Sequence, residues 1–235
     1  MDKENPNPFE GNTPELEAGK RQINMFFVRH GQQQDYANPA SFLSDEGARQ
    51  IEEEFADPFI TWLEGQDRES VVQVLSSPRT RALQSGLLIR NRIERAIEEG
   101  RIQKTSLLSF QAMPDLLQTQ PISELLKMGY TNPYATWHEL SDDFMALNGI
   151  PSPLEVAELT ARTIRALSDL SRILGPGPQL NYILVAHETT IGALVRKHFG
   201  VNTEIEHGES IGVFLGRSIF FHFRGRMTGD LDGLR

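Results

Sequence analysis

The apolar positions of this chain follow two patterns: short continuous runs, and longer stretches in which apolar residues recur every three or four positions. The runs at residues 25–28, 71–77, 105–110 and 181–187 are typical of strands that are buried on both faces. The recurring stretches predict amphipathic helices between these strands and after the last one. Because strands that alternate with helices favour a mostly parallel sheet with helices on both faces, we expect an α/β fold, a three-layer α/β/α sandwich.

Capping residues and helix breakers set the expected ends of the helices. Ser44 can cap the first helix, which we expect to end at Asp57-Pro58, because the residue before a proline disfavours helical backbone. Ser152 and Glu155 form a capping box at the start of a long helix. The predicted inward faces of three helices consist of Ala48, Ile51 and Phe55, of Ala82, Gly86, Ile89, Ile93 and Ile97, and of Ile191, Leu194, Val195 and Phe199.

Residues 111–151 show no single continuous period. We expect two short helices, around residues 122–128 and 138–147, in a segment that forms the lid or wall of a cleft. Its aromatic residues either pack the lid onto the domain or contact an organic substrate. They are Tyr130, Tyr134, Trp137 and Phe144. Further along the chain, residues 210–215 and 218–224 predict a closing hairpin.

Length and composition narrow the class of protein. Residues 1–22 are polar and rich in proline and glycine, so we expect a flexible N-terminal tail and a single domain at residues 23–235. The chain has no cysteine and no apolar run of the length that a membrane helix needs, so we expect a cytoplasmic protein without membrane contacts. The formal net charge of −9 argues against binding to nucleic acid. The charge of an anionic ligand must therefore be met locally.

Basic residues follow three of the predicted strands. Arg29 and His30 follow the first strand, residues 77–81 the second and His187 the last. Ligands of such sheets bind beyond the carboxyl ends of the strands, so we expect these residues to share one cleft. Guanidinium groups and helix N-termini suit a phosphoryl group, and a neutral imidazole can attack phosphorus while a second imidazole stabilises the developing charge. This chemistry needs no metal and no cofactor.

Four segments, FFVRHG, LSDEGARQ, SSPRTRALQSG and ILVAHETTIGAL, occur in this order and resemble the histidine phosphatase superfamily, also called the phosphoglycerate mutase-like proteins. The resemblance spans about residues 24–222. It implies a phosphoglycerate mutase-like fold, in which His30 is the nucleophile that becomes a phosphohistidine. Arg29, Arg81 and His187 are then expected to form the phosphate pocket.

The proton donor departs from the common pattern of that family. A glutamate normally stands in a segment similar to AMPDLLQTQ, where this chain has Gln118, and a glutamine cannot donate a proton as an acid does. The acid-phosphatase and phytase branch instead carries an acidic residue directly after the second histidine, which implies Glu188 as general acid here, with Asp115 as the second candidate. A carboxylate that merely favours the start of a helix is the alternative for Glu188. Gln33, in the loop after the nucleophile, is expected to donate an amide hydrogen bond to the phosphate.

The other histidines carry weaker signals. His138, His198 and His222 have no motif around them and are expected to be structural or exposed. His207, in EIEHGES, either lines the cleft or belongs to an ordinary loop. Its spacing from the two motif histidines is not that of a chelating pair, so we do not expect a metal site.

These patterns and the resemblance together predict a metal-independent phosphomonoester hydrolase, a histidine phosphatase that acts through a phosphohistidine intermediate on a small phosphorylated metabolite. A phosphoglycerate-type phosphomutase, which returns the phosphoryl group to a substrate, is one alternative. The other is a non-catalytic module that binds a phospho-ligand or a partner and has lost its acid at Gln118. The sequence leaves a homodimer open.

Overall fold

The computed structural model describes residues 9, 21–35, 38, 40–114, 120–215 and 219–230. The strands of this part of the chain form one sheet with the order β3-β2-β5-β1-β6-β7-β8, and β4 also pairs with β2. The strands are β1 (Ile23–Arg29), β2 (Ser70–Ser76), β3 (Thr105–Leu107), β4 (Gln111–Ala112), β5 (Gln179–Ala186), β6 (Ser210–Leu215), β7 (Ile219–Phe223) and β8 (Arg226–Asp230). The helices are α1 (Asp45–Ile51), the π-helix η1 (Glu52–Ala56), α2 (Asp57–Glu64), α3 (Thr80–Glu98), α4 (Gln120–Lys127), α5 (Pro133–Glu139), α6 (Asp142–Leu147), α7 (Pro153–Leu174) and α8 (Glu188–Phe199).

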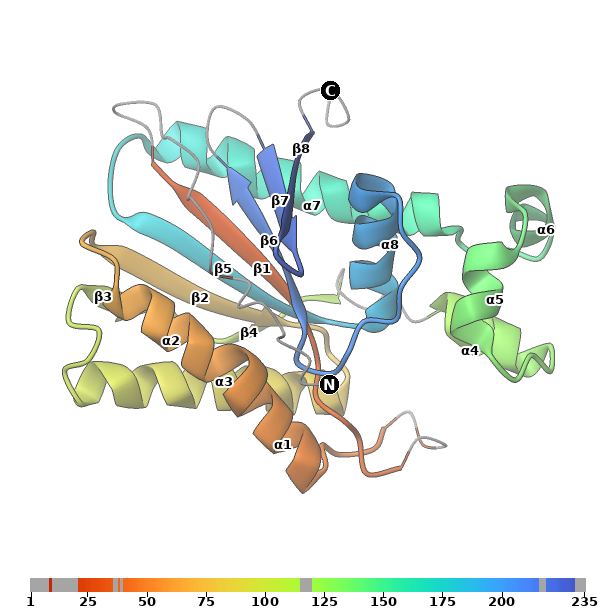
Figure 1. Cartoon of the computed structure of the whole chain (residues 1–235), viewed down its shortest axis with the longest axis horizontal. Coiled ribbons are helices and arrows are strands. Elements are labelled where there is room, and N and C mark those ends of the chain that lie inside the picture. The colour runs from red at the N-terminus through yellow and green to blue at the C-terminus, as the bar shows by residue number, and fades with distance from the viewer. Residues whose placement is uncertain are drawn as a thin grey trace.

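The sheet is parallel from β3 to β1 and antiparallel from β6 to β8. Helices α1 to α3 cover one face and α7 and α8 cover the other, which confirms the three-layer α/β/α sandwich (Figure 1). Strand β1 contributes side chains to the cores on both faces of the sheet, because successive side chains of a strand point to opposite faces. Phe26 and Val28 belong to the core under α1 to α3, whereas Met25 and Phe27 belong to the core under α7 and α8. The predicted closing hairpin is extended by β8, a strand that the sequence analysis did not identify.

The prediction that Asp57-Pro58 ends the first helix is wrong. Helix α1 continues through η1 into α2, and the N–H of Asp57 donates to the carbonyl of Glu52, five residues earlier. A π-helical turn directly before a proline leaves room for the ring and removes the need for its missing N–H. Phe55 and Phe59, one turn apart and stacked at 5.8 Å, are both fully buried and hold this continuation against the sheet.

The lid segment folds into α4, α5 and α6, which lie together at the end of the molecule where β1, β2 and β5 finish (Figure 1). The second predicted short helix, at residues 138–147, is in fact divided between α5 and α6, because Ser141 accepts a hydrogen bond from the N–H of Phe144 and caps a new helix. Trp137 of α5 is fully buried and donates from Nε1 to the carbonyl of Pro151, 2.8 Å away. The lid therefore has a small core of its own, which packs on α7 and α8.

One apolar residue of the predicted N-terminal tail packs on the core. Within the predicted N-terminal tail, Phe9 is buried against Phe26, Phe55 and Phe59; the tail residues 1–8 and 10–20 lie outside the described residues. In the described part of the chain, no helix combines the length and the apolar character required to cross a membrane.

Candidate active site

The sheet register brings the two motif histidines together. Arg29 at the end of β1 is paired with Ala186 at the end of β5, and Ser76 of β2 is paired with Val185. His30 and His187, the residues that follow β1 and β5, therefore emerge at the same level, and Ser77 emerges one residue earlier. As a result the rings of His30 and His187 lie 5.1 Å apart between centroids, edge to face at 67°. The two histidines therefore meet beyond the carboxyl ends of β1 and β5.

The glycine after His30 is required by a close approach of two chain segments. A Cβ on Gly31 would lie 2.1 Å from the carbonyl oxygen of Gly47 in α1, and a Cβ on Gly47 would lie 2.1 Å from the carbonyl oxygen of Gln32. The N–H of Gly31 donates to Ser85 Oγ at 3.2 Å, which ties the same loop to α3. The backbone next to His30 is therefore held in place by packing on α1 and by a hydrogen bond to α3.

The hydrogen bonds of His30 define its tautomer. Nδ1 lies 2.8 Å from the carbonyl oxygen of Gly31, which can only accept, so Nδ1 carries the proton. Nε2 lies 2.9 Å from Nε of Arg81, which can only donate, so Nε2 carries the lone pair. The nitrogen that faces the arginine is thus the one that can act as a nucleophile.

Two arginines border this nitrogen. Arg81 comes from the first turn of α3, and its guanidinium reaches His30. Arg29, at the end of β1, is 8% exposed; it donates to the carbonyl of Ile205 and lies 3.2 Å from a carboxylate oxygen of Glu188. Its buried Nε has no partner among the described residues. Arg29 Nε is therefore an N–H donor that an anion can use.

His187 is held from β2. Its Nε2 lies 2.8 Å from the hydroxyl of Ser77, and its buried Nδ1 has no partner among the described residues. The backbone N–H of Ser77 donates to the carbonyl of Val185, so the serine is fixed to the strand that carries the histidine. His187 is also the N-cap residue of α8, a helix end that favours negative charge.

Both motif histidines are neutral in the free protein. Burial lowers the pKa of His30 well below the ordinary value of 6.5, and His187 and Arg81 lower it further. Burial also lowers the pKa of His187 well below that value, assisted by Arg81 and Arg79. The arginines that would bind a phosphate therefore keep the nucleophile unprotonated. A bound dianion would offset these cations and favour protonation of a neighbouring imidazole.

Glu188, the first residue of α8, is 7% exposed. Burial raises the pKa of its carboxyl group above the ordinary value of 4.5, the ion pair with Arg29 opposes this shift, and the nearby charge of Glu204 adds to it. The larger cause is thus burial rather than a neighbouring negative charge. Because an anion bound by Arg29 would weaken the ion pair, it would favour the protonated carboxyl further.

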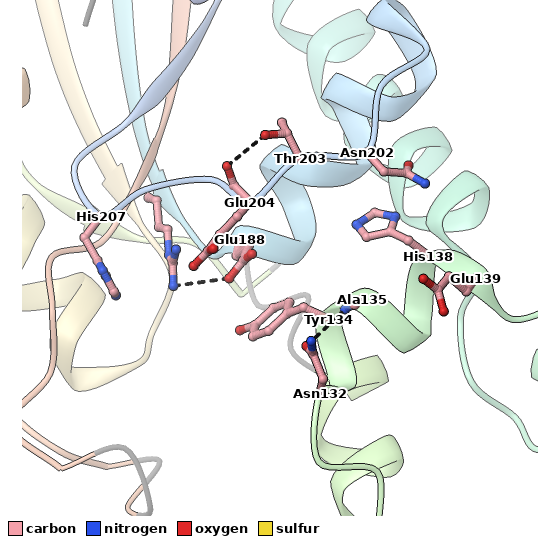
Figure 2. A pocket seen from close by; sticks show the side chains of 11 residues that line it. Asn132, Tyr134, Ala135, His138, Glu139, Glu188, Asn202, Thr203, Glu204 and His207 are labelled. Atoms are coloured by element: carbon pink, nitrogen blue, oxygen red, sulfur yellow. Dashed lines mark hydrogen bonds and ion pairs between the residues drawn. The ribbon is translucent and has the colours of Figure 1, made fainter. Parts of the chain in front are cut away.

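A pocket of about 550 Å³ opens beside this centre and is shared with the lid. Figure 2 shows Tyr134 of α5 extending from the lid towards Glu188, and Arg29 and His207 also line the pocket. Its other lining residues are Asn132, Ala135, His138, Glu139, Asn202, Thr203 and Glu204. Substrate groups beyond the phosphate would enter this space.

His207 belongs to the site, an alternative that the sequence analysis left open. Its ring lies 5.9 Å from that of His30, and burial together with Arg29 and Arg81 lowers its pKa to about 4. The N–H of Gly208 donates to the carbonyl of Arg29 at 3.0 Å, so the loop before β6 is fastened to the end of β1. The antiparallel pairing of β6 with β1 explains why His207 lies near His30. No local pattern in the sequence predicts this pairing.

The remaining candidates stand as follows. Gln33 is buried, its backbone pairs with Leu43, and its side-chain oxygen accepts no hydrogen bond from a described residue, so an amide contact with phosphate stays a prediction. Asp115 and Gln118 lie outside the described residues. His138, expected to be structural or exposed, also lines the pocket. Among the described residues, no group of three or more acidic and histidine side chains is arranged to hold a metal ion.

No protein-family model matches the chain, and no curated protein matches it in sequence. Solved structures do match. Phosphoglycerate mutase from Bacillus anthracis is 15% identical, with a TM-score of 0.53 over 92% of this chain and 94% of that one. A mycobacterial hydrolase is 16% identical, with a TM-score of 0.52 over 89% and 96% of the two chains. A histidine-to-alanine mutant of phosphoserine phosphatase from Entamoeba histolytica, in complex with phosphoserine, is 10% identical, with a TM-score of 0.51 over 91% and 98%.

These similarities extend over nearly the whole length of each compared chain, but at identities that establish the fold alone. They agree with the three-layer architecture of the described residues. The chain therefore has a phosphoglycerate mutase-like fold.

Proposed function

We propose that this protein is a histidine phosphatase, a metal-independent hydrolase of small phosphomonoesters that acts through a phosphohistidine on His30. The observation that carries the proposal is the state of His30: its Nδ1 is engaged by the Gly31 carbonyl, its Nε2 presents a lone pair, and an arginine lies 2.9 Å from that nitrogen. A neutral, oriented imidazole beside guanidinium groups is what attack on a phosphoryl group requires.

In the first step, His30 Nε2 attacks phosphorus in line with the ester oxygen. Arg29, Arg81 and the free nitrogen of His187 bind the non-bridging oxygens as their charge develops. The bond between phosphorus and the ester oxygen breaks, its electron pair goes to that oxygen, and the Glu188 carboxyl group supplies a proton to give the free alcohol.

In the second step, water attacks the phosphohistidine. The Glu188 carboxylate produced in the first step accepts a proton from the water, the phosphorus–nitrogen bond breaks, and its electron pair returns to Nε2. Inorganic phosphate leaves and both groups regain their starting states. The scheme requires Glu188 to be an acid in one step and a base in the other, and its buried position with a raised pKa suits both.

The comparisons support this reaction class. One protein of this fold is a phosphoserine phosphatase that was crystallised with phosphoserine, and another is a phosphoglycerate mutase. The mutase alternative uses the same first step and differs in the acceptor of the phosphoryl group. A module that only binds a phospho-ligand would not form the covalent intermediate at all.

The proposal is tested with 4-nitrophenyl phosphate, whose good leaving group makes it a general substrate. The wild-type protein should hydrolyse it. When the reaction with phosphate-labelled substrate is stopped without acid, the protein should carry labelled phosphate that is stable in alkali and lost in acid. His30→Ala should abolish both signals. His198→Ala is the matched control, because His198 stacks on Phe221 near the other end of α8 and should leave turnover intact. Absence of wild-type turnover, or activity that survives in His30→Ala, would overturn the proposal.

A further inference from the structure

The pocket beside the phosphate site is lined by polar and apolar groups, and its charged lining residues are Arg29, Glu139, Glu188 and Glu204. Figure 2 shows Glu204, in the loop after α8, beside Glu188, whereas Glu139 lies in the lid beyond His138. Arg29 is the only lysine or arginine among the described lining residues. A ligand in this pocket therefore meets one guanidinium group and three carboxyl groups.

Neither Glu139 nor Glu204 is neutralised by an ion pair with a described residue. Arg224 pairs with Glu209 at 2.5 Å, and its hydrogen bond to Glu204 is made to the backbone carbonyl. Arg196 donates to the backbone carbonyl of His138 at 2.8 Å. Both Glu139 and Glu204 are exposed residues that line the pocket.

The charge of Glu204 is effective inside the site and not only at its rim, because it contributes to the raised pKa of Glu188. A leaving group attached to the phosphoryl group must pass Glu188 and extend towards Glu204. Tyr134 projects into the same space and offers an aromatic ring (Figure 2). Carboxylates beside an aromatic ring attract a cation, whereas they repel a second anion.

We propose that the preferred substrate is a phosphomonoester whose alcohol carries an amine and no carboxylate or second phosphate. This inference rests on the proposed function, since it assigns the substrate of the same site. The phosphate lies among the arginines and histidines, and the ammonium group lies in the pocket that Glu139 and Glu204 line. A pocket of about 550 Å³ accommodates a small polar alcohol of this kind. Phosphoglycerates, whose carboxylate would enter this pocket, are poor substrates on this account.

The test compares three esters of similar size with the wild-type protein at one pH and low salt. Phosphoethanolamine carries an amine, glycerol 3-phosphate is neutral beyond its phosphate, and phosphoglycolate carries a carboxylate. We expect kcat/KM to fall by about fivefold or more at each step of this series, the effect of one charge at close range in a water-exposed site. An order in which the carboxylate ester equals or exceeds the amine ester would overturn the inference.

Glu204→Gln and Glu139→Gln test the residues themselves. Each variant should reduce the preference for phosphoethanolamine over glycerol 3-phosphate by about fivefold. A ratio of two substrates at one pH cancels any change in the pKa of Glu188. The matched control is Glu206→Gln, which removes the same charge from an exposed residue of the same loop that does not line the pocket. Its ratio should equal that of the wild type.

The outcomes separate this inference from the proposed function. Hydrolysis of 4-nitrophenyl phosphate that depends on His30 supports the proposed function whatever the order of the three esters. If that hydrolysis is present while phosphoethanolamine is not turned over, or while both glutamine variants keep the wild-type ratio, the inference on the substrate fails alone. If neither protein variant folds, the wild-type series of esters decides the matter.

Discussion

At the scale of single residues, the nucleophile and the proton donor have pKa values displaced in opposite directions. Burial and neighbouring cations lower the pKa of His30 from 6.5, and burial raises the pKa of Glu188 from 4.5. The proposed first step needs His30 neutral and Glu188 protonated. With ordinary values, few molecules would hold that combination at any pH, because the carboxyl group would lose its proton before the imidazole did. The two pKa shifts increase the fraction of molecules in which His30 is neutral and Glu188 is protonated.

This arrangement predicts the pH profile of Glu188→Gln. The wild-type kcat/KM for an alkyl phosphate should decline as the pH rises through the raised pKa of Glu188, and at acid pH only below the lowered pKa of His30. The glutamine variant should lose the decline on the high-pH side and about 10²-fold in rate. With 4-nitrophenyl phosphate the loss should be much smaller, because that leaving group needs little protonation.

Equal losses on the alkyl and aryl substrates would contradict the acid role and favour the alternative that Glu188 is only a helix-start carboxylate. A thermal melt of Glu188→Gln serves as the control for folding, since the variant also loses the charge that pairs with Arg29 at 3.2 Å. Asp115 would then be the next candidate for mutation.

At the scale of elements, the loop after β1 converts a sequence motif into geometry. The crossing of Gly31 and Gly47 leaves no space for a Cβ on either residue. Gly31→Ala should therefore force the backbone apart and lower the free energy of unfolding by about 1–3 kcal/mol. Because His30 is the adjacent residue, activity should fall more steeply than stability. Urea unfolding and steady-state kinetics measure the two effects.

Gly65→Ala is the control for this prediction. Gly65 follows α2 with a φ of −77°, and an added Cβ would meet only ordinary contact at 3.5 Å. The alanine should be neutral or slightly stabilising, because it restricts the unfolded chain at no cost in the folded one. A similar loss of stability in both variants would show that the crossing of the two segments is not the cause.

The elements also show why part of this structure could be predicted and part could not. Buried runs such as that of β1 and capping residues such as Ser152 are local signals, and they predict the strands and the long helix. The basic residues that follow the strands predict where the site lies. Pro58 is a local signal that tertiary packing overrides, because burial of Phe55 and Phe59 favours a continuous helix. The position of Tyr134 depends on how the lid docks, which no local pattern encodes.

At the scale of the whole molecule, a chain of net charge −9 has arginines in its site beside two buried and two half-buried histidines. Two of these, His30 and His187, have pKa values well below 6.5, and those of His138 and His207 are lowered to about 4. In the unfolded chain each would titrate at about 6.5. Below that pH the unfolded state therefore binds more protons than the folded state, and each histidine favours unfolding.

The stability of the protein should consequently fall as the pH is lowered from 7.5 to 5.5. The contribution of each histidine is fully present above pH 6.5 and is lost towards its folded pKa, with a limiting slope of roughly 1.4 kcal/mol per pH unit. Glu188 acts in the opposite direction, since its raised pKa lets the folded state bind the extra proton, but it is one group against four. Urea midpoints at the two pH values measure the fall, and His138→Gln, which removes one of the four groups, should make it smaller. A midpoint that stays constant or rises on acidification would mean that the imidazoles have the same pKa values in the folded and unfolded states. His30 would then be protonated on mild acidification, and the proposed chemistry, which depends on a neutral nucleophile, would lose its support.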